Sequence, residues 1–371
     1  MSRYIWQHPD WTLFRWDPGA LLSVISDCRM RQGRLLNQVS SLGLKLGEEA
    51  QAEIVVEEAV KTTAIEGENL SRASVRSSVA RRLGLPAAGL SVDRQVDGLV
   101  TVLLDATRNF NEPLTVKRLH GWHAALFPTG YSGMHEIKVG KWRGLEPMRV
   151  VSGPVGREAV HFEAPPSEQV AKEVNRFLSW WKVERGKTEG LLRAAIAHFW
   201  FVTIHPYEDG NGRIARAITD MAIAQDDRQP FRYYSLSAQI MTDRDEYYRV
   251  LERCQKGDGD ITEWLSWFLG CFSRAIEGSE KTLSTVLDKA RFWNKYAGLT
   301  LSDRQRKVLN RLLDAGSGGF EGGLTTRKYV SMAKVSRATA FREIEHLLQL
   351  GMIRRRPGGG RSVSYEIFWP D

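Results

Sequence analysis

The sequence has 371 residues, of which 42% are hydrophobic and 26% charged, a composition typical of a globular chain with room for roughly two or three domains. It has neither an apolar run of the ~20 residues that cross a membrane nor the apolar core of a signal peptide, so we expect a cytoplasmic protein without a membrane partner. The net charge of +8 resides in residues 291–371, which hold 15 Lys and Arg against 7 Asp and Glu and so indicate a nucleic-acid partner for that segment alone.

The N-terminal third begins with an aromatic segment and continues as helices. Residues 1–20 are dense in tryptophan and phenylalanine, which predicts an extended arm that covers apolar surface on the body of the protein. Helical patterns follow over residues 19–43 and 47–64, and a further helix begins near Asn69 or Ser71 after a stop at Gly67. The three cysteines of the chain lack metal-type spacing and are odd in number, which argues against a zinc site and a disulfide framework.

Residues 92–127 continue the helical pattern and contain His120 and His123, three positions apart. This spacing would suit a metal pair, but no third ligand stands nearby in the sequence, so we interpret them as histidines on a helix face. Residues 128–166 are rich in turn residues, and alternating apolar runs over 148–153 and 159–162 predict a β-hairpin. A helix over 167–185 follows.

Residues 205–216, His-Pro-Tyr-Glu-Asp-Gly-Asn-Gly-Arg-Ile-Ala-Arg, lie between two apolar runs of helical spacing. Gly210 and Gly212 allow backbone N–H groups to converge beside a helix N-terminus, an arrangement that favours a bound anion such as phosphate. Arg213 and Arg216 leave the new helix on one face and can hold further phosphate oxygens. The loop therefore predicts a polyphosphate site.

Two more side chains of this loop carry chemistry. Asp209 stands beside the anion site, where a Mg²⁺ held by one carboxylate and by substrate oxygens is a common arrangement. His205 has an ordinary pKa suited to proton transfer near neutral pH, which makes it the candidate base. A His-Pro or a Gly-Asn-Gly alone usually marks a loop or a turn, and it is their conjunction that indicates catalysis.

The C-terminal part returns to helices. Residues 230–240 indicate a short turn, residues 243–268 a helix with adjacent Tyr247 and Tyr248, and residues 270–300 a linking helix. From residue 301, three helical patterns precede two strands with a basic, glycine-rich run between them, an order that resembles a winged helix-turn-helix. This resemblance implies a DNA partner, with a protein partner as the alternative.

The loop over 205–216 resembles the signature of Fic-domain proteins (the Fic/DOC family), His-Pro-Phe-x-Asp/Glu-Gly-Asn-Gly-Arg-x-x-Arg. The departure is Tyr207 in place of Phe, which keeps the ring and adds a hydroxyl that needs a partner if it is buried. The resemblance implies His205 as the catalytic base and ATP with Mg²⁺ bound through Asp209, Gly210, Asn211, Gly212, Arg213 and Arg216, with Asp209 as the metal ligand.

An N-terminal motif also resembles this family. Thr62-x-x-x-Glu66-Gly67 matches the inhibitory motif of Fic proteins, Ser/Thr-x-x-x-Glu-Gly/Asn, within a region similar to the small helical domain often found ahead of Fic domains. The resemblance implies that Glu66 pairs with Arg216 and takes the place of the γ-phosphate. ATP would then fail to bind, or would bind with its α-phosphate misaligned for attack.

The hairpin occupies the position of the Fic flap, which binds an extended segment of a target protein by strand addition. The resemblance implies that Val150, Val151 and Ser152 border the nucleotide. Tyr247, Tyr248 and Gln255 match positions that line the adenine, with ordinary helix packing as the alternative for the two tyrosines.

The sequence thus predicts a mainly α protein. An N-terminal helical domain with the inhibitory helix covers residues 1–90, a helical Fic catalytic domain with a β-hairpin flap covers 91–275, and a linker helix with a winged helix-turn-helix domain covers 276–371. The implied function is a protein adenylyltransferase, autoinhibited through Glu66, that moves AMP from ATP to a Ser, Thr or Tyr hydroxyl of a target protein.

Two alternatives to this function stay open. The first is an enzyme that removes AMP or transfers another phosphate-containing group. The second is a DNA-binding transcription regulator in which the Fic domain senses a nucleotide. The sequence also leaves open whether the chain forms a homodimer.

Overall fold

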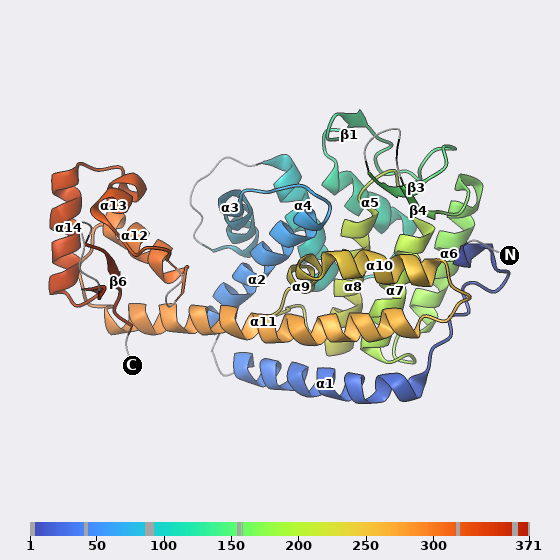
Figure 1. The fold of residues 1–371 in the computed structure, drawn as a ribbon, viewed down its shortest axis with the longest axis horizontal. Helices are drawn as coiled ribbons and strands as arrows, with labels where there is room; N and C mark the ends of the chain where they lie inside the picture. The colour runs from blue at the N-terminus through green and yellow to red at the C-terminus, as the bar shows by residue number, and fades with distance from the viewer. Residues whose placement is uncertain are drawn as a thin grey trace. The chain divides into compact units, whose positions relative to one another are not determined.

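The computed structural model describes residues 4–40, 44–85, 93–153, 157, 159–316, 320–357 and 363–369 (Figure 1). The chain divides into two compact units. One comprises Met1–Val39 with Gln51–Ser279, and the other comprises Ser40–Ala50 with Glu280–Asp371. The protein is mainly helical, as the sequence predicts.

As far as residue 295, the helices are η1 (Ile5–Gln7), α1 (Pro18–Ser40), α2 (Leu44–Ile65), α3 (Arg72–Leu83), α4 (Arg94–Arg108), α5 (Val116–Leu126), α6 (Ser167–Val183), α7 (Gly190–Ile204), α8 (Asn211–Asp227), α9 (Leu236–Thr242), α10 (Arg244–Gln255) and α11 (Thr262–Lys295). The strands β1 (Tyr131–Ser132) and β2 (His135–Glu136) form one antiparallel pair, and β3 (Arg149–Ser152) and β4 (Ala159–Glu163) form another. None of the helices in the described ranges is both long and apolar enough to span a membrane.

Two buried helices, α7 and α8, pack along each other at the centre of the first unit (Figure 1). Every residue of α7 from Leu191 to Ile204 is buried, as is usual for a helix that is apolar on all sides. α8 is buried from Arg213 to Gln225, and α4 and α5 pack against it. The loop that joins α7 to α8 is therefore held between two buried helices, as the sequence predicts.

The N-terminal arm covers apolar surface of this helical body, as its aromatic residues predict. It is not extended throughout, because η1 and turns occupy residues 5–13. The indole Nε1 of Trp6 donates a 2.7 Å hydrogen bond to the carbonyl oxygen of Glu163 at the end of β4. Trp11 is buried, and the ring of Phe14 meets that of Trp200 on α7 edge to face at 5.5 Å. The arm thus joins the hairpin to the central helices.

The prediction of one helix over residues 243–268 is wrong. α10 ends at Gln255, and α11 begins at Thr262 and runs to residue 295, so the linking helix starts earlier than expected. Gly259 between them has a φ of +102°, which favours glycine, and the carboxylate of Asp260 accepts a hydrogen bond from the backbone N–H of Thr262. The expected turn over 230–240 is also partly helical, because Ser235 caps α9.

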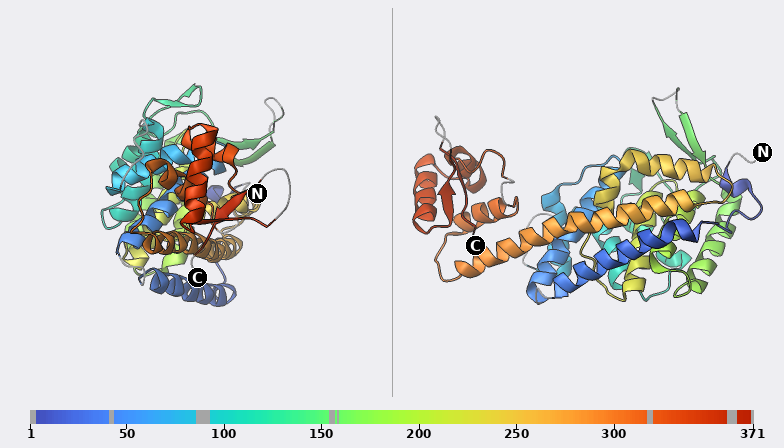
Figure 2. Two further views of the ribbon diagram at one scale, coloured as in Figure 1. Left: turned by 90° about the vertical axis from the view of Figure 1, so that its left-hand side faces the viewer. Right: turned by 60° about the horizontal axis from the view of Figure 1, so that its bottom comes forward.

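The predicted hairpin is present as the antiparallel pair of β3 and β4, with a register irregularity between Val150 and Val151. In both views of Figure 2 the pair stands out from the helices around it. Its base is anchored by a small apolar cluster in which Tyr4 of the arm packs on Phe162 and Ala164. The turn at residues 154–156 lies outside the described residues.

In the C-terminal unit, α12 (Asp303–Leu313), α13 (Thr326–Ala333) and α14 (Arg337–Gln349) precede the antiparallel strands β5 (Ile353–Arg355) and β6 (Tyr365–Ile367). Their shared core includes Leu309, Tyr329 and Ile344. This order of three helices and two strands is the one expected of a winged helix-turn-helix, an assignment that stays a prediction. Most of the glycine-rich run, residues 358–362, lies outside the described residues.

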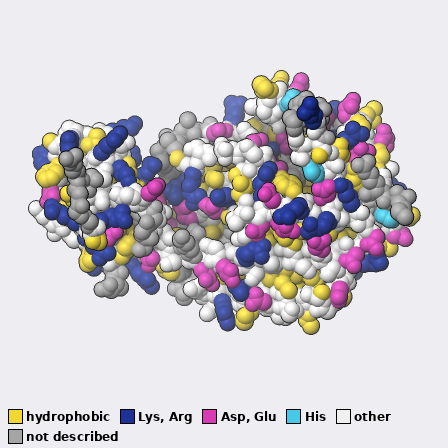
Figure 3. Space-filling model, in the orientation of Figure 1, with side chains coloured by type: hydrophobic (Ala, Val, Ile, Leu, Met, Phe, Trp, Pro, Cys, Tyr) yellow, Lys and Arg dark blue, Asp and Glu magenta, His cyan; other side chains and the backbone are white. Residues whose placement is uncertain are grey.

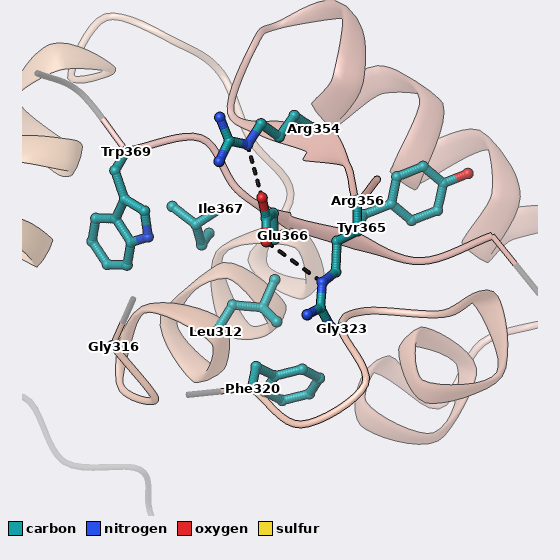
Figure 4. A pocket seen from close by; sticks show the side chains of 10 residues that line it. All are labelled: Leu312, Gly316, Phe320, Gly323, Arg354, Arg356, Tyr365, Glu366, Ile367 and Trp369. Carbon is teal, nitrogen blue, oxygen red and sulfur yellow. Dashed lines mark hydrogen bonds and ion pairs between the residues drawn. The ribbon is translucent and has the colours of Figure 1, made fainter. Parts of the chain in front are cut away.

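A small cavity of about 60 Å³ lies in this unit beside β5 and β6 (Figure 4). Arg354 and Arg356 line it, and both pair with the carboxylate of Glu366, at 2.8 and 3.5 Å. Such a volume has room for only a few water molecules. The two ion pairs therefore join the strands across the sheet and leave little room for a ligand.

The close approach of α4 and α5 gives a test of the packing that supports the loop. A Cβ at Gly98 on α4 would overlap the backbone carbonyl oxygen of Ala125 on α5. Gly98→Ala should therefore force the helices apart and lower the free energy of unfolding by about 1–3 kcal/mol or more. Gly121→Ala on α5 is the matched control, because nothing lies within 4 Å of its Cβ. It should stabilise the protein by about 0.5–1 kcal/mol. Urea denaturation measures both, and equal effects would contradict the close packing.

Candidate active site

The loop between α7 and α8 turns through two left-handed residues. His205 ends α7 with φ +51°, and Gly210 opens α8 with φ +80°. A Cβ at Gly210 would meet the ring of Phe127 at 2.8 Å, so glycine is required there by both conformation and space. The first N–H groups of α8 consequently open onto the loop, which favours an anion at that point.

The side chain of Asn211 holds the loop from inside. Its Oδ1 accepts a hydrogen bond from the backbone N–H of Tyr207, and its Nδ2 donates to the carbonyl oxygen of the same residue, both at 2.9 Å. Because Asn211 is buried and its amide is engaged at both ends, its contribution here is to the shape of the loop. The expected role in orienting phosphate stays a prediction.

Two histidines of α5 support the loop from outside. Tyr207 is fully buried, with its ring stacked on that of His123 at 4.1 Å and its hydroxyl 3.1 Å from Nδ1 of His120. His123 accepts a hydrogen bond at Nδ1 from Gly140 and donates from Nε2 to the carbonyl oxygen of Asp209. Burial lowers the pKa of His123 to about 4, so it remains neutral. The hydroxyl that Tyr207 adds to the usual phenylalanine thus has a partner.

His205 is oriented by its own helix. Nδ1 lies 3.0 Å from the carbonyl oxygen of Val202, which only accepts hydrogen bonds, so Nδ1 carries the proton and Nε2 has a free lone pair. Burial lowers the pKa of the His205 imidazole below its ordinary value, which keeps the ring neutral at physiological pH. Arg143 fixes the turn by donating a 2.8 Å hydrogen bond to the carbonyl oxygen of His205. These contacts leave Nε2 able to accept a proton.

Arg216 is buried against the end of α2, with 1% of its side chain exposed. Its Nε donates to the hydroxyl of Thr62 at 2.6 Å, and its Nη2 donates to the Thr62 carbonyl oxygen at 2.9 Å and to Oε1 of Glu66 at 2.7 Å. Burial opposes the charge of Arg216, but the facing Glu66 carboxylate outweighs it and raises the pKa of the guanidinium. The structure therefore brings Glu66 and Arg216 together.

A second carboxylate of the turn after α2, that of Glu68, faces the other arginine, Arg213. This pair was not predicted from the sequence. Oε2 of Glu68 lies 3.6 Å from Nη1 of Arg213, and Gly67 between the two glutamates has φ +86°. Glu68 also accepts a hydrogen bond from Gln95 on α4. The signal in the sequence was the Glu-Gly-Glu run itself, since two carboxylates in one turn can meet two arginines three positions apart on a helix.

Both arginines keep buried N–H groups that no described residue satisfies. These are Nε of Arg213 and Nη1 of Arg216, whereas Nη2 of Arg213 forms a 3.5 Å ion pair with Oδ1 of Asp209. The guanidinium of Arg213 also lies over the ring of Phe127, 4.8 Å from its centre. Buried donors without acceptors are costly, so their presence beside a helix N-terminus fits a site that binds an anion with several oxygens.

Asp209 is partly exposed, and its carboxylate accepts hydrogen bonds from the backbone N–H of Gly210 and from the hydroxyl of Ser132 in β1. The neighbouring Glu208 is occupied by the backbone N–H groups of Lys138 and Gly144. No group of three or more metal-ligating side chains occurs among the described residues. One carboxylate fits Mg²⁺ only if the oxygens of a bound phosphate complete its coordination.

The residues expected around the adenine lie on α10. Tyr247 is buried with its hydroxyl 2.8 Å from Nε2 of His198, and Gln255 is buried with its amide donating to Thr203. Tyr248 is half-buried. Packing therefore engages Tyr247 and Gln255, and of the three only Tyr248 presents a substantial free surface. On β3, Val150 is half-buried whereas Val151 and Ser152 are exposed.

The surface over α10 and the start of α11 carries both signs of charge (Figure 3). Glu246 pairs with Arg249 and Arg253, and Lys256 pairs with Glu252 at 2.5 Å. A surface of mixed sign exerts little long-range attraction on an anion. This surface therefore adds little to the attraction of an anion by the loop and its arginines.

Two parts of this chain match known protein families. Residues 113–223 match the Fic/DOC family, and residues 4–85 match a family described as a domain of unknown function, DUF4172. The chain is 25% identical over 224 residues to a protein adenylyltransferase Fic of Nematostella vectensis, and 28% identical over 200 residues to protein adenylyltransferase fic-1 of Caenorhabditis elegans. These matches cover 58% and 53% of this chain but only 46% and 36% of the two relatives, so the chain spans less than half of their length.

Solved structures give the same result for the fold. A Fic family protein from Desulfovibrio desulfuricans G20 is similar over 95% of this chain and 96% of its own, with a TM-score of 0.54 and 19% identity. A Fic domain-containing signaling protein from Bacteroides thetaiotaomicron is similar over 70% of this chain and 98% of its own, with a TM-score of 0.53 and 16% identity. At such identities the likeness concerns the fold alone. Residues 113–223, with the loop that joins α7 to α8, form a Fic/DOC family domain in a chain that has the fold of Fic family proteins.

Proposed function

We propose that the protein is an adenylyltransferase that moves AMP from ATP to a Ser, Thr or Tyr hydroxyl of a target protein. One observation carries the proposal: a neutral His205 with a free Nε2 stands in the same loop as buried arginine N–H groups that lack an acceptor. A base beside a polyphosphate site is the equipment for transfer of a phosphate-containing group. The names of the curated relatives support AMP as that group.

The phosphates of ATP would be held by α8. Its first backbone N–H groups face the loop, and Arg213 and Arg216 offer the unsatisfied donors. Gly212 contributes by having no side chain, because a Cβ there would overlap the carboxylate of Glu66 and fill the space beside Arg216. Asp209 would hold a Mg²⁺ that neutralises charge on the phosphates.

In the chemical step, His205 acts as the base that accepts the hydroxyl proton. The hydroxyl oxygen of the target bonds to the α-phosphorus, the bond from that phosphorus to the leaving pyrophosphate breaks, and the hydroxyl proton moves to Nε2. Val202 keeps Nδ1 protonated, so the accepting nitrogen is always the one that faces away from the helix end. Positioning and charge neutralisation supply the rest of the acceleration.

The same site would be switched off by the turn after α2. Glu66 lies on Arg216 at 2.7 Å, where a phosphate oxygen would otherwise bind. Glu68 faces Arg213 at the longer distance of 3.6 Å with 36% of its side chain exposed. Two carboxylates would thus occupy both arginines in the absence of substrate, the first strongly and the second weakly.

The C-terminal unit supports a second function, DNA binding. Arg337, Phe341 and Arg342 are exposed on α14, and neither arginine has an ion-pair partner among the described residues. A helix that opens after a short turn and presents free arginines is suited to the major groove. The excess of positive charge in residues 291–371 favours a polyanionic partner.

Replacing the base should separate binding from chemistry. His205→Ala should lower the rate of AMP transfer by at least about 10²-fold, because no group remains to accept the hydroxyl proton. ATP affinity, measured by calorimetry, should stay within about twofold. Transfer is measured as incorporation of label from ATP carrying it on the α-phosphate. Undiminished labelling in this variant would remove His205 from the mechanism.

The inhibitory pairing predicts graded activation. Glu66→Ala should raise self-labelling by about tenfold or more, the factor that corresponds to 1.4 kcal/mol. Glu68→Ala should raise it only about two- to threefold, because a long, partly exposed ion pair contributes less than about 1 kcal/mol. Glu57→Ala is the control, since Glu57 lies on α2 and pairs with Lys61 and Arg72. Equal rates in all three variants would rule out inhibition by this turn.

Mass spectrometry of an AMP-bearing acceptor tests whether the enzyme removes AMP instead.

DNA binding should depend on salt in a predictable way. Arg342→Ala and Arg337→Ala should each weaken binding of duplex DNA and reduce the slope of log K against log salt by about 1, the value for one lost phosphate contact. Arg311→Ala on α12 removes the same charge from another helix and should leave the slope unchanged. Fluorescence anisotropy with labelled duplex measures all three. A full-length protein that binds no duplex at low salt would favour the protein-partner alternative.

A further inference from the structure

A chain of hydrogen-bonded side chains joins the β3–β4 hairpin to α10. Oγ of Ser152 lies 2.6 Å from Nε2 of His161, and Nδ1 of His161 lies 2.8 Å from Oε2 of Glu252. The other oxygen of Glu252 accepts a 2.5 Å hydrogen bond from Nζ of Lys256. Three elements, β3, β4 and α10, are therefore connected through one imidazole.

The protonation of His161 follows from its partners. A carboxylate only accepts hydrogen bonds, so Nδ1 donates its proton to Glu252 and Nε2 accepts the hydroxyl proton of Ser152 when the ring is neutral. Burial raises the pKa of Glu252, but the hydrogen bonds from Lys256 and His161 outweigh it, and the net shift is downward. Glu252 is thus ionised, and its hydrogen bond to His161 is charge-assisted.

The hairpin needs such a connection. An isolated two-stranded ribbon is at best marginally stable in water. The cluster of Tyr4, Phe162 and Ala164 and the hydrogen bond from Trp6 hold the base of this one, near residue 163. The part of the ribbon toward Ser152 is exposed, and β4 packs on α10. Among the described residues, His161 is the side chain whose hydrogen bonds join that part to the helix.

We propose that His161 is a positioning residue that ties the hairpin to α10 and so fixes the edge of β3 on which an extended segment of the target protein adds as a strand. This role deepens the proposed function and rests on it. The edge of β3 is suited to strand addition because Val151 and Ser152 are exposed beside it. With the tether broken, the strand edge would be mobile, and target binding would have to order it at a cost in affinity.

The mobility of the hairpin tests the tether without reference to catalysis. Glu252→Ala should increase the rate of hydrogen–deuterium exchange of the β4 amides from residue 159 to residue 161 by about tenfold, because these residues pair with the end of β3 toward Ser152. Glu246→Ala on the same helix is the control, because among the described residues Glu246 forms ion pairs only with Arg249 and Arg253, so its loss should leave the hairpin unchanged. Unchanged exchange in both variants would overturn the tether.

Steady-state kinetics test whether the tether serves target binding. The acceptor is a synthetic peptide copied from the self-labelled segment that mass spectrometry identifies in the Glu66→Ala protein. In that background, His161→Phe should raise KM for the peptide about tenfold and change kcat and KM for ATP less than about twofold. Glu252→Gln, which keeps an acceptor oxygen toward His161, should recover most of the loss seen with Glu252→Ala.

The outcomes separate this proposal from the one it rests on. If the Glu66→Ala protein transfers no AMP, the proposed function fails, and the exchange experiment still decides the tether. A rise in KM for ATP equal to that for the peptide would overturn a role confined to target positioning. Ser, His and Glu in this order also form the nucleophile arrangement of some hydrolases. Covalent labelling of Ser152 by a fluorophosphonate would therefore replace the positioning role with a nucleophilic one.

Discussion

The buried guanidinium of Arg216 constrains the residues packed around it in the first unit, because its charge must be compensated. A charge removed from water is unfavourable unless an opposite charge and hydrogen bonds accompany it. Here Thr62 and Glu66 supply them, and one N–H group of Arg216 is still unsatisfied. The arginine therefore requires an anion at all times, either a carboxylate of its own chain or the phosphate of a substrate. In the proposed enzyme, the inhibitory carboxylate and the substrate phosphate would each neutralise the charge of Arg216.

The chemistry of the loop could be predicted from the sequence because it is local. Histidine, aspartate, glycines and arginines within twelve residues are read directly, and a helix start after Gly210 follows from the apolar spacing beyond it. The partners of these residues are not local. Asn211 binds the backbone of Tyr207, and Glu68 reaches Arg213 from more than a hundred residues away. Their roles therefore depend on a tertiary arrangement that no spacing rule encodes.

The helix boundaries show a similar limit. Residues 243–268 are apolar at helical intervals almost throughout, so periodicity alone predicts one element. The break at residues 256–261 comes from Gly257 and Gly259 with the capping carboxylate of Asp260, short-range signals that the longer pattern masks. His120 and His123 are interpreted from the sequence as histidines on a helix face, because no third ligand stands nearby. That they support Tyr207 could not be inferred, because α5 and the loop are about eighty residues apart.

α10 contacts both the turn that precedes Glu66 and the hairpin that carries His161. Near its N-terminal end, Arg244 donates a 2.8 Å hydrogen bond to the carbonyl oxygen of Ile65, the residue before Glu66. Near its C-terminal end, Glu252 holds His161 of the hairpin. A helix moves as a rigid rod over this length, so displacement of the turn at Glu66 by a nucleotide would be transmitted to the hairpin as a shift of α10. The contact proposed to block the phosphates and the contact proposed to hold the target strand thus share one element, and in the proposed enzyme α10 would couple nucleotide binding to target binding.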